Sequence, residues 1–242
     1  MTVPPSLQPL PDDIARVLCV VAHPDDMEYG ASAVVAQWTR HGVEVAYLLL
    51  TSGEAGMQRP PEEVGPLRAE EQRRACATVG VQDLTILDHP DGHLVYSLDL
   101  RRDIAREIRR FRPDAVVASS SAIEAPWGLE QADHRAAGLA TLDAVRDADN
   151  TWVFRELGEV EGLPKWHARR VLVMGGSPAT HYVEVDAEAR AAAVASLSCH
   201  EAYLDDLPWH PSPADLLGGV FAGQGQAAGV EAAVLFRVYD LG

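Results

Sequence analysis

The sequence predicts an α/β fold with a Rossmann-like, mostly parallel sheet and helices on both of its faces. Short apolar segments rich in β-branched residues alternate along the chain with longer segments whose apolar residues recur at helical spacing. The first two short segments are almost wholly apolar, which is typical of strands buried on both faces of a parallel sheet. Because parallel strands end at one common edge, we expect the functional site in the loops at their carboxyl ends.

The individual elements follow from local patterns taken in chain order. Predicted strands are residues 16–22, 43–50, 84–87, 115–118, 171–174, 181–185 and 232–239. Predicted helices are residues 29–41, 66–79, 98–111, 133–148 and 188–203. Gly42 and Gly80 end the first two helices, and Pro66 suits a helix start. Residues 149–169 and 208–229 lack a clear period and are predicted to be irregular, and the first of these segments is a candidate cover for the site.

Length, charge and cysteine content restrict the class of protein. The 242 residues suit a single domain spanning residues 1–242. The formal net charge of −16 argues against a nucleic-acid partner and against an anionic membrane surface. Three scattered cysteines form no disulfide framework. Residues 1–13 lack an apolar signal core and no segment has the length of a membrane span, so we expect a cytoplasmic protein. Exposed edge strands would suit a homo-oligomer.

One histidine and three carboxylates follow the first predicted strand, within residues 23–28. His23 and Asp26 can turn toward one point, because Pro24 fixes a sharp local path between them. An imidazole nitrogen and a carboxylate oxygen are good ligands for zinc. Asp25 would point elsewhere, and a carboxylate beside a metal ion but not bound to it is a candidate general base. Glu28 is favoured at the start of the next helix by the helix dipole. The structural alternative is a set of helix caps beside a hydrogen-bonded histidine.

Residues 21–28, Val-Ala-His-Pro-Asp-Asp-Met-Glu, resemble the first motif of the PIG-L/LmbE-like family of zinc-dependent N-deacetylases. That family's second motif is usually His-x-Asp-His, and Asp133 and His134 match its second half. The resemblance implies that His134 is a third zinc ligand beside His23 and Asp26. The fourth predicted strand lies next to the first at the topological switch point, so His134 can approach His23. Asp133 is expected to orient a ligand histidine.

The resemblance also implies an activity. It predicts a zinc-dependent hydrolase that removes the acetyl group from the N-acetyl amine of an amino-sugar conjugate, with Asp25 taking a proton from the attacking water. The expected partner is therefore a small acetylated amino sugar. One alternative is an amidase of mycothiol-type thiol conjugates. Another, of a different class, is a non-catalytic small-molecule binding protein on the same fold. A metal other than zinc also stays open.

The chain departs from the family at the position three residues before the metal histidine. Many members have a second histidine there, and this chain has Gln131. Glutamine can form hydrogen bonds but cannot carry a proton at neutral pH. His181, at the start of a predicted strand, is one candidate for the missing imidazole. The alternative for His181 is a structural histidine at a sheet edge.

Two further residues match family positions that are expected to contact substrate. Arg68 suits polar or anionic substituents, and Asp91 suits sugar hydroxyl groups. Each residue has a structural alternative. Arg68 would pair with Glu70 or Glu71 on a helix surface, and Asp91 would form a turn with the glycine that follows it.

Overall fold

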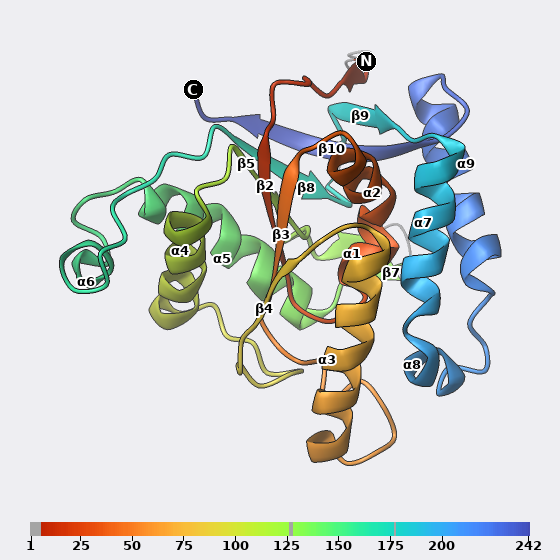
Figure 1. Cartoon of the computed structure of the whole chain (residues 1–242), viewed down its shortest axis with the longest axis horizontal. Coiled ribbons are helices and arrows are strands. Elements are labelled where there is room, and N and C mark those ends of the chain that lie inside the picture. Colours follow the sequence, from red (N-terminus) through yellow and green to blue (C-terminus); the bar gives the residue numbers. More distant parts are fainter. Residues whose placement is uncertain (1–5, 126–127, 177) are drawn as a thin grey trace.

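A computed structural model describes residues 6–125, 128–176 and 178–242. An eight-stranded sheet crosses the molecule in the order β1-β9-β10-β8-β5-β2-β3-β4 (Figure 1). Five neighbouring strands are mutually parallel, namely β8 (Arg170–Met174), β5 (Ala115–Ala118), β2 (Arg16–Val21), β3 (Glu44–Leu49) and β4 (Asp83–Ile86). The remaining strands of the sheet are β1 (Gln8–Pro9), β9 (His181–Glu184) and β10 (Ala233–Asp240). Because β10 alone runs antiparallel to its neighbours, the prediction of a mostly parallel sheet is confirmed.

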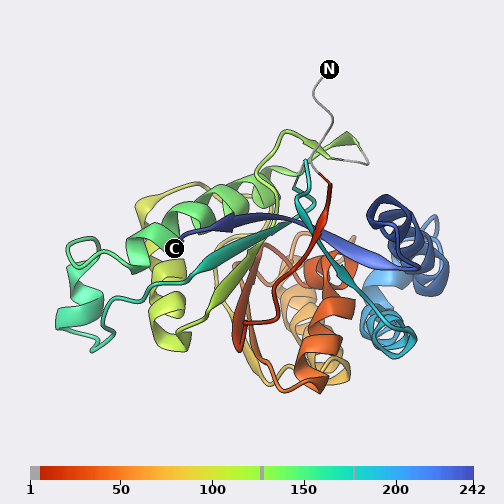
Figure 2. The ribbon, with the colours of Figure 1, turned by 90° about the horizontal axis from the view of Figure 1, so that it is seen from above.

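Helices cover both faces of the sheet, as the sequence predicted (Figure 2). One face carries α4 (Leu98–Phe111) and α5 (Ala132–Ala148). The other face carries α1 (Asp26–Gly30), α2 (Ser32–Arg40), α3 (Pro61–Thr78), α7 (Ala187–Ser198) and α9 (Pro213–Ala228). Successive side chains of β2 point to opposite faces, so Cys19 joins the core under α2 and α7 while Leu18 joins the core under α4 and α5. This double burial explains the uniformly apolar sequence of β2.

The topological switch point lies between β5 and β2. Val116 pairs with Leu18, so the fourth predicted strand is next to the first, as expected. Helix α5 approaches the end of β5 closely, because a Cβ atom on Gly138 would lie 2.5 Å from the carbonyl oxygen of Ser119. This close packing brings the first turn of α5, with His134, over the loop that ends β2.

Helix α9 contradicts the prediction that residues 208–229 are irregular. Ser212 caps it by accepting the backbone N–H of Asp215, and Gly229, with φ of 76°, ends it. The glycines that favoured a loop include Gly225, where a Cβ atom would lie 2.7 Å from Cα of Ala232. Glycine is needed at this position because the helix packs directly against the segment that leads into β10. Tertiary packing therefore overrides a poor helix propensity.

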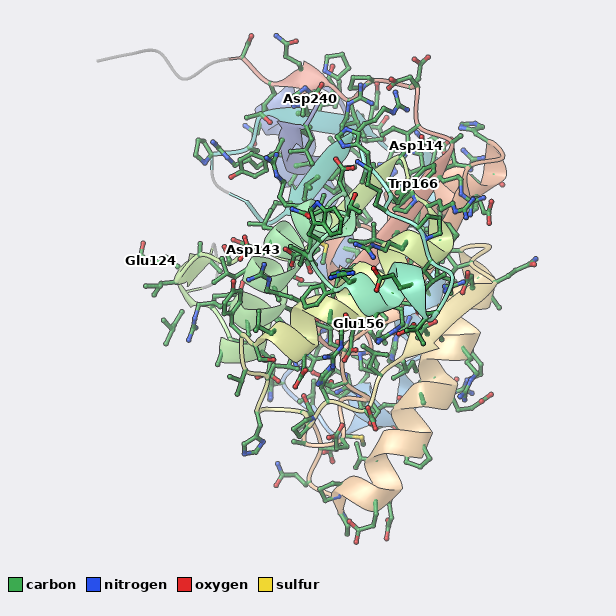
Figure 3. All side chains as sticks on the ribbon, turned by 90° about the vertical axis from the view of Figure 1, so that its left-hand side faces the viewer. Asp114, Glu124, Asp143, Glu156, Trp166 and Asp240 are labelled. Carbon is green, nitrogen blue, oxygen red and sulfur yellow. The ribbon has the colours of Figure 1, made fainter. Side chains whose placement is uncertain are left out.

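The segment of residues 149–169 does not cover the candidate site. It contains α6 (Arg155–Glu159), and the side chain of Trp166 donates a hydrogen bond to the carbonyl of Pro113, at 2.7 Å. Pro113 precedes β5, so this segment packs at the amino ends of the strands, beside α4 and α5 (Figure 3). The site was expected at the opposite edge.

The predicted helix of residues 188–203 is two helices. Helix α7 ends at Ser198, and α8 (Glu201–Asp205) begins after a break at Cys199 and His200. The remaining described strands are β6 (Glu124–Ala125) and β7 (Gly128–Leu129), which form a small hairpin before α5. Among the described residues, no helix is both long enough and apolar enough to cross a bilayer.

Candidate metal centre

The loop that ends β2 fixes the carboxylate of Asp26. Its Oδ2 accepts the backbone N–H groups of Ala22, at 3.0 Å, and of His23, at 2.9 Å. The other oxygen, Oδ1, lies 3.0 Å from Nε2 of His134. Burial acts to raise the pKa of Asp26, but the two adjacent imidazoles hold it well below its usual range. Asp26 is therefore an anchored anion with one oxygen directed at His134.

Three donor atoms converge at this point. Nδ1 of His23 lies 3.2 Å from Nε2 of His134 and 3.6 Å from Oδ1 of Asp26. Metal–ligand bonds of about 2.0–2.1 Å in a tetrahedral zinc site place neighbouring donors about 3.3 Å apart. The separations and the chemistry of these donors fit a divalent metal ion. His23, Asp26 and His134 thus form a group that could hold a metal.

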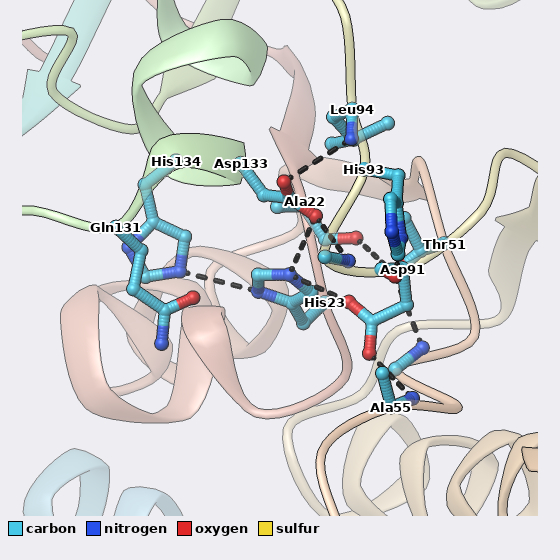
Figure 4. A network of polar contacts seen from close by, with 12 residues as sticks. Ala22, His23, Thr51, Ala55, Asp91, His93, Leu94, Gln131, Asp133 and His134 are labelled. Atoms are coloured by element: carbon cyan, nitrogen blue, oxygen red, sulfur yellow. Dashed lines mark hydrogen bonds and ion pairs between the residues drawn. The ribbon is translucent and has the colours of Figure 1, made fainter.

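A carboxylate lies behind each of the two imidazoles, and Figure 4 shows the two beside His23. Nε2 of His23 is 2.9 Å from Oδ1 of Asp91 and 3.4 Å from Oδ2 of Asp133. Nδ1 of His134 is 2.8 Å from Oε1 of Glu130. A ring nitrogen that faces a carboxylate carries the proton, which leaves the lone pair on the opposite nitrogen free for a metal. Both histidines are therefore oriented as ligands are in known metal sites.

The electrostatics of the donor group favour a cation. Burial acts to lower the pKa of His23, but the charge of Asp26 and the neighbouring carboxylates raise it to about 12. Burial likewise opposes protonation of His134, and Asp26 outweighs it to give a pKa of about 9. These shifts mean that positive charge is stabilised where the donors meet.

Asp25 lies beside this group and is not part of it. It is 4% exposed, and its backbone has a φ of 85°, a left-handed conformation that few residues other than glycine adopt. Its Oδ2 accepts a hydrogen bond from Nη2 of Arg68 at 2.9 Å, and its backbone N–H donates to Oε1 of Gln72, also at 2.9 Å. Burial raises the pKa of Asp25 to about 6, against the opposing charge of Arg68. Such a carboxylate suits proton transfer near neutral pH.

Arg68 differs from its structural alternative, whereas Asp91 does form the expected turn with Gly92. Arg68 is 3% exposed and points at Asp25, so the alternative of a helix-surface pair with Glu70 or Glu71 is wrong. Asp91 is also buried, and its Oδ2 accepts the backbone N–H of Ala55. Arg68 therefore contacts Asp25, and Asp91 contacts His23, which is one of the three donors.

The three remaining predicted residues lie in different parts of the structure. Gln131 is exposed beside His134 at the start of α5 (Figure 4). His181 contacts Thr180, and within the described ranges no hydrogen bond or ion pair joins it to the candidate centre. β10 and β8 separate its strand from β5. Glu28 lies in the first turn of α1, as expected, and its buried carboxylate contacts Ser196 at 3.0 Å and Gln72.

Two residues that contact the site were not predicted from the sequence, namely Glu130 and Gln72. Glu130 lies four residues before His134, a spacing that could have indicated a partner. Gln72 lies four residues after Arg68 on α3, so both side chains reach the same loop. Neither residue type is distinctive without the fold, because glutamate and glutamine are common on helices.

The family profile and the similar proteins all indicate the same family for this chain. A profile of the family described as PIG-L, GlcNAc-PI de-N-acetylase, matches residues 18–145, which is more than half of the chain. The diacetylchitobiose deacetylase of Thermococcus kodakarensis is 34% identical over 139 residues, covering 55% of this chain and 50% of that protein. A probable N-acetyl-alpha-D-glucosaminyl L-malate deacetylase 2 of Bacillus anthracis is 31% identical over 138 residues, covering 54% and 59%.

The chain thus spans about half the length of these curated relatives. Among solved structures, N,N'-diacetylchitobiose deacetylase from Pyrococcus horikoshii has a TM-score of 0.83 at 22% identity, covering 94% of this chain and 85% of that one. That similarity shows a shared fold. The matched segment runs from β2 into α5 and contains every donor of the candidate centre. The chain belongs to the PIG-L family.

Proposed function

We propose that the protein is a zinc-dependent N-deacetylase of acetylated amino-sugar conjugates. The observation that carries the proposal is the convergence of His23, Asp26 and His134 on one point, with Asp25 left outside the group. Relatives named as deacetylases of diacetylchitobiose and of an N-acetylglucosaminyl malate support the substrate class. Two imidazoles and one carboxylate, with a position left for water, are typical of catalytic zinc.

His23, Asp26 and His134 would hold the metal. When bound, zinc polarises the acyl oxygen and lowers the pKa of a water molecule to about 7. Asp25 would accept the proton of the attacking water, and its position beside the donors suits that transfer. Arg68 keeps the Asp25 carboxylate in one orientation through the hydrogen bond at 2.9 Å. Asp25 can then pass the proton to the departing amine, so that amide and water become acetate and amine.

The reaction is testable by acetate release. We expect the zinc-loaded protein to release acetate from at least one of N,N'-diacetylchitobiose, N-acetylglucosaminyl malate and N-acetylglucosaminyl inositol. A panel of thiol conjugates tests the amidase alternative in the same assay. Zinc binding without release of any acyl group from the whole panel would instead support a non-catalytic binding protein.

Asp25→Asn is the decisive variant for the base. We expect it to bind zinc as the wild type does, because Asp25 is not a donor, and to lose at least about 100-fold in kcat, because asparagine cannot take a proton. Metal analysis and acetate release measure the two effects. Turnover near the wild-type level would show that Asp25 is not the base.

A cytoplasmic location and a homo-oligomeric state are further expectations from the sequence. Cell fractionation and light scattering would test them.

A further inference from the structure

The guanidinium group of Arg68 is held at its edge by backbone and by Asp25. Nη1 donates to the carbonyl of Gly53 at 3.0 Å, and Nη2 donates to that of Pro24 at 2.6 Å as well as to Asp25. A Cβ atom on Gly53 would overlap Arg68, and one on Gly56 would lie 2.5 Å from Nη1. The glycine loop after β3 therefore forms a close-fitting cradle.

Two parts of the Arg68 side chain take no part in these hydrogen bonds, namely Nε and the flat face of the guanidinium. Nε is buried and has no acceptor among the described residues. The flat face of the guanidinium is covered by the ring of Tyr203, whose centroid lies 4.2 Å from Cζ. A cation over an aromatic face at this distance is attracted to the ring, more strongly where water is excluded. The tyrosine ring is thus the contact on the face of Arg68.

Tyr203 reaches this position from a distant part of the chain. Helix α8 lies beyond the matched family segment of residues 18–145. The break between α7 and α8 redirects the chain, and the N–H of Ala202 donates to Oε1 of Glu71 at 2.7 Å. Glu71 is 2% exposed and lies one turn after Arg68 on α3. The same helix therefore anchors α8 and carries the arginine on which Tyr203 packs.

Tyr203 also lies close to the carboxylate that Arg68 holds. Burial raises the pKa of the Tyr203 phenol to about 12, and the charge of Asp25 adds to the shift. The contacts thus run from the ring to the guanidinium and from the guanidinium to the carboxylate.

We propose that Tyr203 is a positioning residue for Asp25, acting through Arg68. The ring fixes the plane of the guanidinium, and the guanidinium in turn fixes the carboxylate that accepts the proton. This inference rests on the proposed function, because it assigns Tyr203 a part in proton transfer. In this proposal the ring on Arg68 carries the effect, and Tyr203→Phe separates it from any effect of the hydroxyl group, which lies near Asp25. Tyr203 contacts none of the three metal donors in the described contacts.

The test compares Tyr203→Leu with Tyr203→Phe in the zinc-loaded enzyme. We expect Tyr203→Leu to lower kcat about tenfold, the loss that corresponds to a cation–π contact in a partly desolvated site. Its KM and zinc content should equal those of the wild type, because neither the donors nor a substrate contact has changed. Tyr203→Phe keeps the ring and should restore kcat to within about twofold of the wild type.

A matched control exists on β10, where Cζ of Arg237 lies 5.3 Å from the ring of Tyr239. Tyr239→Leu removes the same kind of contact away from Asp25 and should leave kcat unchanged. Circular dichroism checks folding, and Tyr203→Met is the second ring-free variant if Tyr203→Leu does not fold.

Three outcomes overturn the inference in an active wild-type enzyme. These are an unchanged kcat in the ring-free variant, an equal loss in Tyr203→Phe, and an equal loss in Tyr239→Leu. Absence of acetate release by the wild type is a different result, because it removes the proposed function itself.

Discussion

At the scale of single residues, each histidine of the candidate centre has a buried carboxylate behind it. Glu130 is 5% exposed and lies 2.8 Å from Nδ1 of His134, on the side away from the other donors. Such partners fix the ring and raise its basicity as a ligand. The affinity of the candidate centre for a metal ion should therefore depend on residues that are not among its donors.

Glu130→Gln tests this dependence. Glutamine keeps the size of the side chain but removes the charge, so we expect zinc affinity to fall about 10- to 100-fold. Competition with a chelator measures the change. The control is Glu124→Gln, an exposed glutamate on the hairpin before α5, which should bind zinc as the wild type does. Equal affinities for Glu130→Gln and the wild type would contradict the assigned partner.

Gln131→His tests the departure from the family pattern. Gln131 lies beside His134 (Figure 4), and glutamine cannot carry a proton. An imidazole at this position could protonate the departing amine, and we expect kcat to rise by about tenfold, a modest share of a typical general-acid contribution. Steady-state kinetics of acetate release measure it. An unchanged kcat would indicate that Asp25 alone supplies the proton.

At the scale of secondary structure, α5 connects the end of β5 to the metal donors. Gly138 permits the close contact, and its neighbours there are backbone atoms of Ser119 and Ser120 that cannot rotate away. The position of His134 therefore depends on a glycine one turn farther along the same helix.

Gly138→Ala should shift α5 and destabilise the fold by about 1–3 kcal/mol, the usual cost of overpacking. Zinc affinity should fall with it, because His134 moves. The control is Gly218→Ala in α9, where no atom lies within 4 Å of the added Cβ and alanine should add about 0.5–1 kcal/mol of stability. Thermal unfolding and zinc titration measure both variants. A stable, zinc-binding Gly138→Ala would show that α5 can adjust.

Elements differ in how well their sequences predict them. All seven predicted strands occur, because an apolar run that ends in a turn signal is a local feature of a buried strand. Helix α9 was missed, since glycines at positions such as 218 and 225 lower helix propensity whatever the helix packs against. The break at Cys199 and His200 was missed because the residues around it suit a continuous helix.

At the scale of the whole molecule, the candidate centre joins segments far apart in sequence. His23 and His134 are separated by 111 positions and come from a strand end and a helix start. A metal ion bound between them would tie the two halves of the sheet's carboxyl edge together. Binding to the folded state alone stabilises it by mass action.

Zinc removal should therefore lower the melting temperature. At a zinc concentration 100 times the dissociation constant the stabilisation is about 2.7 kcal/mol, which corresponds to a shift of about 5–10 °C in a chain of this size. Scanning calorimetry with zinc and with a chelator measures it. His134→Ala should show little dependence on zinc, and an equal shift in that variant would place the bound zinc elsewhere.

The sequence by itself determined the sheet, its strand order around the switch point and the grouping of His23, Asp26 and His134. The sheet and its order follow from the local hydrophobic period and from the rule that parallel strands end at a common edge. The grouping of the three donors follows from the resemblance of residues 21–28 and 133–134 to two motifs of the PIG-L/LmbE-like family. Only the tertiary structure decided that Arg68 is buried against Asp25 and that Tyr203 packs on its face. Contacts of this kind depend on where a helix breaks and which glycines allow close packing, and no short stretch of sequence encodes either.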